Sequence, residues 1–249
     1  MTWWHGVLIA IAGVWAGTIN TVVGSGTLVT FPVLVAMGYP PVTATTSNAI
    51  GLIPGTITGA YGYRGELAGS ARRLARWSVM SALGAVGGTV LLLSLPEDAF
   101  ETIVPFLIGL ALVLVVVQPM LTRQLRRTRA DRRPTWPILP LILLVGVYGG
   151  YFTAAQGILL IGVMGPLLDE PLQRLNGYKN VLAAVVNVVA GAVYAVVAPV
   201  SWPVVAILAV SSTVGGVLGA RIGRRLPPNV LRAVIVLVGL VAIVRLVTQ

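Results

Sequence analysis

The sequence predicts an all-α integral membrane protein of about ten membrane segments, and three observations lead to this fold class. Hydrophobic residues make up 57% of the 249 residues, charged residues only 10%, and the mean hydropathy is +0.93, which is far from the composition of a soluble domain. Apolar runs recur along the whole chain, and several reach the roughly 20 residues that cross the hydrocarbon as a helix. These runs are apolar on every side, whereas the strands of a membrane β-barrel alternate apolar and polar residues.

The apolar segments follow one another at short intervals. They cover approximately residues 5–22, 26–39, 44–63, 77–95, 101–121, 136–154, 156–168, 178–198, 202–220 and 229–247. The segments 26–39 and 156–168 are too short to cross upright, because about 13 residues at about 1.5 Å each reach only about 20 Å. We therefore expect broken or short helices near the midplane. Residues 5–39 fit either a spanning pair or a re-entrant hairpin, and both return the chain to the same side.

The positions of the charges predict the topology. If ten segments alternate in direction, every Lys and Arg except Arg245 falls on one face, and the other face carries Glu97, Asp98 and Glu101. By the positive-inside rule the basic face is cytoplasmic, which places both termini outside. This topology accounts for the net charge of +10, so we expect the lipid bilayer as a partner and no nucleic acid.

An internal repeat divides the chain into two halves. Shifting the sequence by 132 residues pairs Asn48 with Asn180, and it matches several small residues as well: Gly17 with Gly149, Gly59 with Gly191, Gly84 with Gly216 and Gly87 with Gly219. The predicted units are residues 1–121 and 136–249, joined by a basic cytoplasmic linker at 122–135. Each half has five segments, and an odd number forces the second copy to be inverted in the membrane. The acidic connection at 96–101 has a basic counterpart at 221–229, as inverted copies require.

The stretch Gly24-Ser25-Gly26-Thr27 interrupts the first apolar region, and Gln156-Gly157 precedes the short segment of the second half. In transporters built from inverted repeats, broken helices expose N–H groups and a positive dipole end near the midplane, where they hold an anion. Such a break is tolerated only where it is buried in protein or lines a water-filled cavity. The alternative is that the glycines only permit tight helix packing.

The sequence resembles the TauE/SafE sulfite exporter family of membrane transporters over nearly its whole length. The resemblance rests on GSGTLVTFPVLVAMGYPPVTATTSNAIGLIPGTITGAYGYR in the first half and on NGYKNVLAAVVNVVAGAVY and VGGVLGARIGRRLPPNVLR in the second. It implies transport of small anions, often sulfur-containing ones such as sulfite or organosulfonates, across a prokaryotic inner membrane. The sequence departs from the family pattern in the second half, where the glycine-rich turn is reduced to AAQGI.

Polar residues inside the segments are the candidate contacts of a small anion. Lys179, the only lysine, is either a topology residue that reaches the interface or a cation that faces the anion path. Asn187 lies deeper in the same segment, where it either joins helices or contacts substrate. The predicted substrate-binding residues are Asn20, Ser25, Gly26, Thr27, Ser47 and Asn48 in the first half and Gln156, Asn176, Lys179, Asn180 and Asn187 in the second.

Other chemistries have little support in the sequence. Cysteine is absent, which excludes disulfides and thiolate sites, and no phosphate-binding loop or metal-ligand cluster is present. The single histidine, His5, stands beside Trp3 and Trp4 and is interpreted as an interfacial anchor. We therefore expect no cofactor, no metal and no catalytic residue. The alternatives to a carrier are a channel-like anion pathway and an intramembrane enzyme, and association into a homo-oligomer stays open.

Overall fold

The computed structural model describes residues 3–127, 137–222, 236, 237 and 240, and these residues form helices without any strand. Ten α-helices and one 3-10 helix follow in this order: α1 (Trp3–Val22), α2 (Thr27–Ala36), α3 (Pro41–Gly51), α4 (Ile53–Gly62), η1 (Arg64–Leu67), α5 (Ala71–Ser94), α6 (Glu97–Arg127), α7 (Ile138–Phe152), α8 (Gln156–Leu167), α9 (Leu172–Val197) and α10 (Trp202–Ile222). The all-α prediction is confirmed for this part of the chain. The tenth expected segment, 229–247, lies outside the described residues apart from positions 236, 237 and 240.

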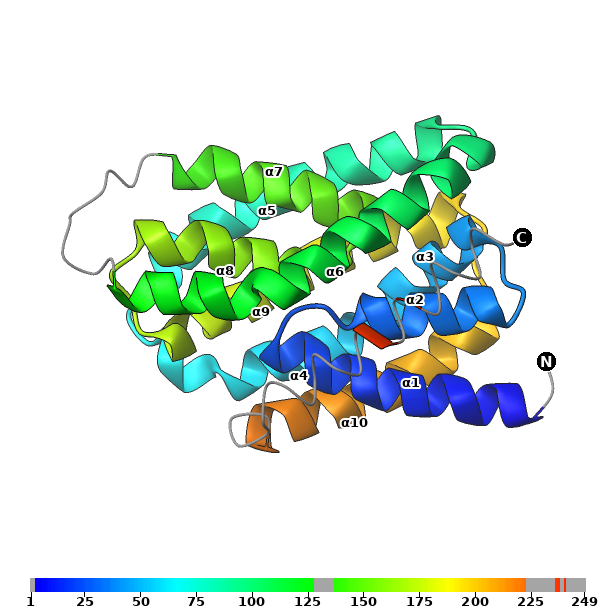
Figure 1. Cartoon of the computed structure of the whole chain (residues 1–249), viewed down its shortest axis with the longest axis horizontal. Coiled ribbons are helices and arrows are strands. Elements are labelled where there is room, and N and C mark those ends of the chain that lie inside the picture. The colour runs from blue at the N-terminus through cyan, green and yellow to red at the C-terminus, as the bar shows by residue number, and fades with distance from the viewer. Residues whose placement is uncertain (1–2, 128–136, 223–235, 238–239, 241–249) are drawn as a thin grey trace.

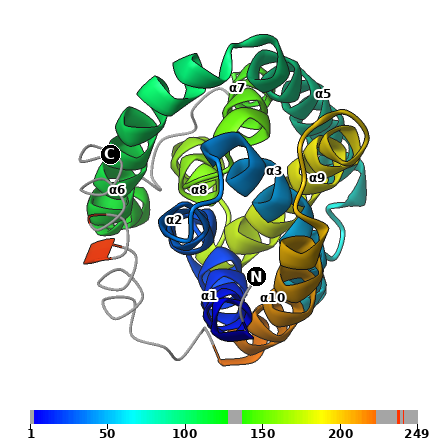
Figure 2. The same ribbon diagram turned by 90° about the vertical axis from the view of Figure 1, so that its right-hand side faces the viewer.

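The helices lie roughly along one common direction (Figure 1). Five of the described helices, α1, α5, α6, α9 and α10, are long and apolar enough to span a membrane, whereas α2, α7 and α8 are shorter apolar helices. Seen end-on, α2, α3 and α8 lie inside a ring that runs from α6 through α7, α5, α9 and α10 to α1 (Figure 2). Helices α2, α3 and α8 are therefore surrounded by protein, as a broken backbone in lipid requires.

Several expected boundaries differ from the structure; for example, α5 begins at Ala71 and not at 77, and α9 begins at Leu172 and not at 178. The segment expected at 44–63 is divided at Leu52 into α3 and α4. Pro54 stands in the first turn of α4, where its missing N–H is tolerated, whereas inside a continuous helix it would remove a hydrogen bond and clash with the preceding turn. Helix α6 continues to Arg127 and so includes the start of the expected linker. The remainder of that linker, from residue 128, is outside the described part.

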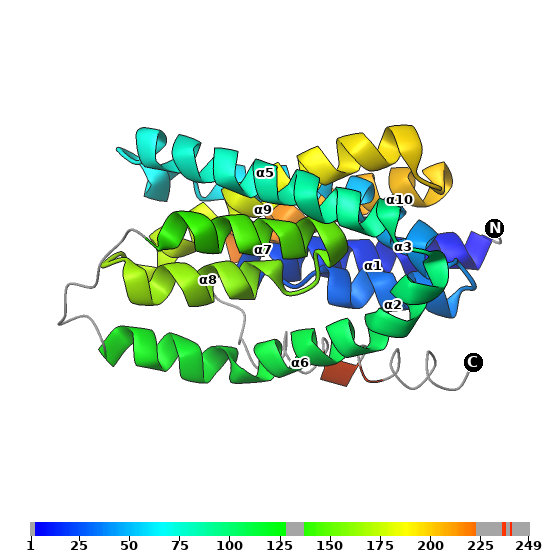
Figure 3. The same ribbon diagram turned by 90° about the horizontal axis from the view of Figure 1, so that it is seen from above.

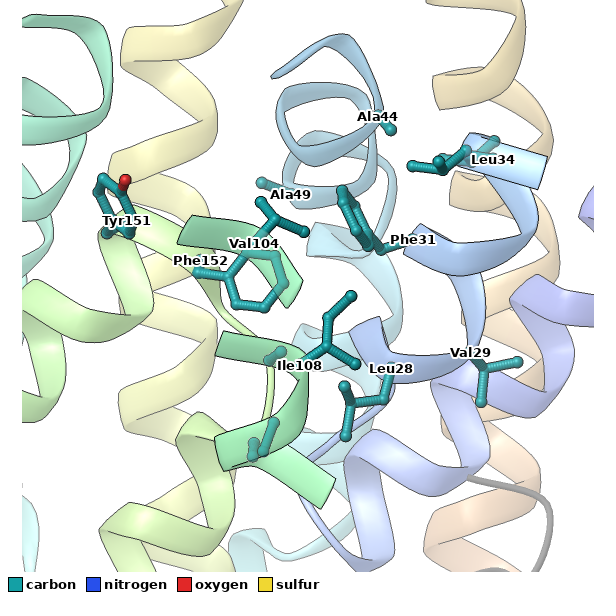
Figure 4. Packing of buried hydrophobic residues seen from close by; sticks show 14 of the residues in the cluster. Leu28, Val29, Phe31, Leu34, Ala44, Ala49, Val104, Ile108, Tyr151 and Phe152 are labelled. Atoms are coloured by element: carbon teal, nitrogen blue, oxygen red, sulfur yellow. The ribbon is translucent and has the colours of Figure 1, made fainter. Parts of the chain in front are cut away.

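The largest cluster of buried apolar residues lies where the short helices meet α6 and α7 (Figure 4). Phe31 of α2 contacts Phe152 of α7 edge to face, with ring centroids 5.3 Å apart, and Phe100 of α6 lies 6.2 Å from Phe152. Edge-to-face pairs of this kind add to the free energy gained from burial itself. The first turn of α6 and the centre of the molecule are thereby held together.

Two helix pairs pack at very short distance through glycine. In the pair α1 and α10, a Cβ on Gly17 would collide with the backbone of Ser212 and Gly216. In the pair α5 and α7, a Cβ on Gly84 would collide with the backbone of Leu143 and Val147. Small residues allow such backbone approach in membranes, where packing and not hydrophobicity drives helix association.

The short helices α2 and α8 each form a hairpin with the preceding helix, α1 or α7, and the two hairpins enter from opposite ends of the molecule. The hairpin of α1 and α2 opens toward one end, and the hairpin of α7 and α8 opens toward the other (Figure 3). Both turn back inside the molecule. The arrangement of α1 and α2 therefore fits the re-entrant alternative and not a pair of full spans, because α2 has only 10 residues and covers about 15 Å.

Candidate functional site

The first hairpin turns at Gly24, which has a φ of +93°. This left-handed conformation suits glycine and strains other residues. The N–H groups of Val23 and Gly24 both donate to the Ile19 carbonyl, at 2.7 and 3.0 Å, and end α1. Helix α2 then begins without a side-chain cap at Gly26, and the N–H groups of Leu28 and Val29 donate to the carbonyls of Ser25 and Gly26, at 3.1 and 3.0 Å.

The second hairpin turns through Thr153 and Ala155, whose φ values of 53° and 59° are also left-handed. Neither residue is glycine, so this turn carries conformational strain of a kind that concentrates at functional sites. Helix α8 begins at Gln156, and Ala155 at its N-cap position offers no side-chain hydrogen bond. The reduced glycine content noted in the sequence is thus accommodated by strain, while the turn itself is retained.

The tips of the two hairpins touch. The Gly157 N–H donates to the Gly24 carbonyl at 3.0 Å, and a Cβ on either glycine would lie 2.5 Å from the other glycine's Cα. Side chains larger than hydrogen are therefore excluded at both positions. This contact brings together the beginnings of α2 and α8, whose positive dipole ends consequently lie close to each other.

Lys179 of α9 borders this contact and is fully buried. Its Cδ would lie 3.2 and 3.0 Å from Cβ atoms placed on Gly24 and Gly157. The ammonium donates to the carbonyls of Asn20 at 3.2 Å and Thr21 at 2.9 Å, which belong to the last turn of α1. A cation at a helix C-terminus is favoured by the dipole. The side chain is buried in protein and its ammonium binds backbone carbonyls, and its contact with an anion stays a prediction.

Asn180 supports the same helix end, because its Nδ2 donates to the Thr21 carbonyl at 3.2 Å. The Thr21 carbonyl thus accepts hydrogen bonds from both Lys179 and Asn180. The Asn20 residue contributes its backbone carbonyl to this arrangement. Asn176 lies one turn earlier on α9 and is half-buried. The sequence could suggest Lys179 and Asn180 from the repeat, but backbone acceptors such as Thr21 have no residue signature that would reveal them.

Asn48 of α3 fixes the first turn of α2. Its Nδ2 donates to the Thr27 hydroxyl at 3.1 Å, and its Oδ1 accepts a hydrogen bond from the Thr30 hydroxyl. Thr30 was not among the predicted residues, although it stands one turn after the glycine stretch on a helix rich in threonine. Ser47 has a different role, because its hydroxyl accepts the Ser201 N–H at 2.8 Å and so anchors the start of α10.

Three predicted residues are buried with unused hydrogen-bonding atoms. The hydroxyl of Ser25 and both amide atoms of Gln156 and of Asn187 have no partner among the described residues, and each of these residues is 1% exposed. Such atoms cost free energy unless water or a ligand satisfies them. Gln156 lies against Gly149, and Ser25 stands directly before the first turn of α2. The hydroxyls of Tyr148 and Tyr151, which the sequence did not single out, share this property.

The structure therefore brings most predicted residues to the meeting point of the two hairpins. Gly26, Thr27 and Asn48 surround the start of α2, Gln156 starts α8, and Lys179 and Asn180 hold the end of α1. Ser47, Asn176 and Asn187 have no described contact with this group. No cluster of three His, Cys, Asp or Glu side chains that could hold a metal occurs in the part of the chain that the structure describes. The chemistry offered is one of amide and hydroxyl donors, helix N-termini and one cation.

Comparisons with known proteins agree on one kind of protein. The family model described as Sulfite exporter TauE/SafE matches residues 9–246. A probable membrane transporter protein, ORF9, of Sinorhizobium is 25% identical over 241 residues, which are 96% of this chain and 91% of that one. A probable membrane transporter protein of Haemophilus influenzae is 23% identical over 96% of this chain and 93% of its own. YfcA, a probable membrane transporter protein of Escherichia coli, is 26% identical over 89% of this chain and 80% of its own. No solved structure matches the chain.

Proposed function

Because the chain belongs to the TauE/SafE sulfite exporter family of membrane transporters, we propose that it carries small anions across a prokaryotic inner membrane. Sulfur-containing oxyanions such as sulfite or an organosulfonate are the proposed substrates. Transport proceeds by alternating access between two halves, residues 1–121 and 136–249, with the substrate bound between them. The five described helices that are long and apolar enough to cross a membrane are consistent with this proposal.

The observation that carries the proposal is the meeting of α2 and α8. Each helix begins at the Gly24–Gly157 contact, and each start carries a buried side chain with unused hydrogen-bonding atoms, Ser25 and Gln156. The positive dipole ends of two helices favour an anion at this point. The first-turn N–H groups of α8 already donate to backbone carbonyls, so the free hydrogen-bonding atoms are those of the Ser25 and Gln156 side chains. A hydroxyl and an amide N–H suit the oxygens of a small oxyanion. Lys179 adds a nearby positive charge that is already stabilised by α1.

Paired helix contacts support the inverted arrangement of the halves. At an offset of 132 residues, α1 corresponds to α7 and α10 corresponds to α5. The structure packs α1 along α10 and α7 along α5, in each case through glycine. The corresponding short helices, α2 and α8, lie in hairpins that open to opposite ends (Figure 3). Inverted repeats of this kind produce alternating access when one half tilts against the other.

The distribution of charge supports a cytoplasmic assignment for one end. Helix η1, the start of α5 and the end of α10 lie at the same end of the molecule (Figure 1), and this end carries Arg64, Arg72 and Arg221. The start of α6, with Asp98, lies at the other end. By the positive-inside rule the first end faces the cytoplasm, and the chain enters α1 from outside.

A flux assay with matched variants tests the proposal. Purified protein in liposomes should exchange labelled sulfite with saturable kinetics, and internal sulfite should accelerate uptake. Gln156→Glu should abolish exchange, because the added carboxylate suits a helix N-terminus but repels the anion. Gln173→Glu, the same change in the first turn of α9, should leave exchange intact.

Each contrary result has a definite meaning. A sulfite conductance that rises linearly without saturation identifies a channel, and chemical conversion of sulfite identifies an enzyme. Exchange that is equally fast in Gln156→Glu and in the parent places the anion away from α8.

A further inference from the structure

The start of α5 is rich in arginine at the level of the membrane surface. Helix α5 has 24 residues, or about 36 Å, which exceeds the roughly 30 Å of hydrocarbon. Its first turns therefore extend into the headgroup region at the end that carries the basic loops. Arg72, Arg73 and Arg76 are exposed there, and the Trp77 that follows is buried.

This helix start is not neutralised by its own residues. Its first turn has no acidic residue, and Ser70 at the N-cap position makes no capping hydrogen bond. The Ser70 hydroxyl is instead paired with the Tyr178 hydroxyl at 2.7 Å. Basic side chains at a helix N-terminus are disfavoured by the dipole, whereas an anion is favoured there. The sequence thus concentrates positive charge at a position where folding alone would place negative charge.

Only one of the three arginines has an anionic partner in the described structure. Arg73 pairs with Glu170 at 2.8 Å, and Glu170 also binds Arg174 at 3.0 Å, so its carboxylate is shared. The Arg73 guanidinium also lies 5.8 Å above the Trp77 ring. For Arg72 and Arg76, no ion pair or hydrogen bond occurs with any residue that the structure describes. Two guanidinium groups, each able to bind two phosphate oxygens, are therefore available.

A cavity of about 430 Å³ adjoins these arginines. One part of its wall is basic and is formed by Arg72, Arg73 and Arg76. The other part is apolar and is formed by Ile138 and Leu139 at the start of α7 and by Leu168 after α8. A cavity that is basic at the headgroup level and apolar beside it matches an amphipathic ligand, because a free phosphate would make no use of the apolar wall.

We propose that this cavity between α5 and α7 binds an anionic phospholipid of the cytoplasmic leaflet. Its phosphodiester lies on Arg72, Arg76 and the first N–H groups of α5. The upper part of an acyl chain lies on Ile138, Leu139 and Leu168. Basic cavities between membrane helices on the cytoplasmic side are suited to such headgroups. The site is distinct from the anion site at the Gly24–Gly157 contact and does not depend on the transported substrate.

Native mass spectrometry of the purified protein tests this proposal with phosphatidylglycerol and phosphatidylcholine of identical acyl chains. The parent should retain phosphatidylglycerol selectively. Arg72→Gln with Arg76→Gln should bind it about tenfold more weakly, because each basic residue near the surface adds to the attraction of an anionic headgroup. Arg64→Gln with Arg221→Gln removes the same charge from the same end, away from the cavity, and should bind as the parent does.

Two further arms separate a lipid site from other causes. Inorganic phosphate at the same concentration should not displace phosphatidylglycerol. Leu139→Trp, which narrows the cavity at its apolar wall without changing the charge, should weaken the binding of phosphatidylglycerol. Equal loss in both arginine pairs would show diffuse attraction instead of a site and would overturn the proposal. Displacement by inorganic phosphate would overturn it in favour of a soluble anion. Unfolding temperatures in lipid-free detergent verify that the variants are folded. If the double variant Arg72→Gln with Arg76→Gln does not fold, the result for Leu139→Trp alone decides whether the proposal holds.

Discussion

Lys179 shows at the residue scale how the end of one helix and the proposed anion site share a single charge. Its ammonium is bound to the Asn20 and Thr21 carbonyls, and these two bonds use two of its three N–H groups. The described residues supply no carboxylate to pair with it. An anion bound at the adjacent helix starts would therefore meet a cation that is uncompensated by any full negative charge.

Replacing Lys179 tests that role. Lys179→Gln should weaken sulfite binding about tenfold or more, because the only full positive charge at the hairpin contact is lost and a charge-assisted hydrogen bond exceeds a neutral one. Sulfite affinity is measured on purified protein at equal folded fraction. Arg127→Gln at the end of α6 removes one charge at a distance and serves as the control. Unchanged sulfite affinity in Lys179→Gln would show that the lysine stabilises the end of α1 and does not contribute to anion binding.

Ala155 provides a second residue-scale prediction, this time of stability. Its φ of 59° is left-handed, and the Cβ of an L-residue in this region costs about 1 kcal/mol. Ala155→Gly should accordingly stabilise the protein by about 1 kcal/mol. Gly24→Ala should destabilise it strongly, since a Cβ there would lie 2.5 Å from Gly157 Cα. Thermal unfolding in detergent measures both, and a destabilised Ala155→Gly would contradict the strain in this turn.

The sequence could predict part of the site and not the rest, for physical reasons. The constant offset identified Asn48 and Asn180, and both do contact the hairpins. At the same offset Ser47 corresponds to Lys179, yet Ser47 binds Ser201 at the start of α10, because a short hydroxyl side chain cannot reach where a lysine reaches. The left-handed conformations of Thr153 and Ala155 could not be foreseen, since neither residue favours them.

At the scale of elements, the sequence located helices by hydrophobicity and missed what divides them. Eight apolar segments expected before residue 200, and a ninth at 202–220, correspond to helices in the structure. The interruption at Leu52 was missed because no charged residue separates α3 from α4. Proline in the first turn of a helix is a weaker signal than the length of the segment expected at 44–63. Hydropathy therefore locates the helices more reliably than it locates the breaks in their backbone.

The glycine contact between α5 and α7 supports an element-scale prediction. A side chain at Gly84 would collide with the Leu143 carbonyl and the Val147 N–H, and backbone cannot yield as a flexible side chain can. Gly84→Val should lower the stability by about 3 kcal/mol, at the upper range of overpacking, and should lower the yield of folded protein. Gly109→Val on α6 is the matched control, because no atom of the described residues lies within 4 Å of its added Cβ. Equal unfolding temperatures of the two variants would show that α5 and α7 separate at little cost.

At the scale of the whole molecule, the proposed topology can be tested without first removing native thiols. The chain contains no cysteine, so each introduced thiol is unique. Asp98→Cys should react with a membrane-impermeant maleimide in intact cells, and Arg64→Cys should react only after the membrane is opened, since basic connections face the cytoplasm. Both positions are exposed in the structure. Labelling of Arg64→Cys from outside would invert the assignment.

The bond between Gly157 and Gly24 has a mechanical consequence. It joins two turns from backbone to backbone at the inner tips of opposed hairpins, where no side chain has to change rotamer when the surrounding helices tilt. In the proposed alternating access this point would be the pivot, so displacement would be smallest there and would grow toward the open ends of the hairpins. Spectroscopic probes at those ends should therefore record a large change of separation during turnover, while the distance between the two glycines stays nearly constant.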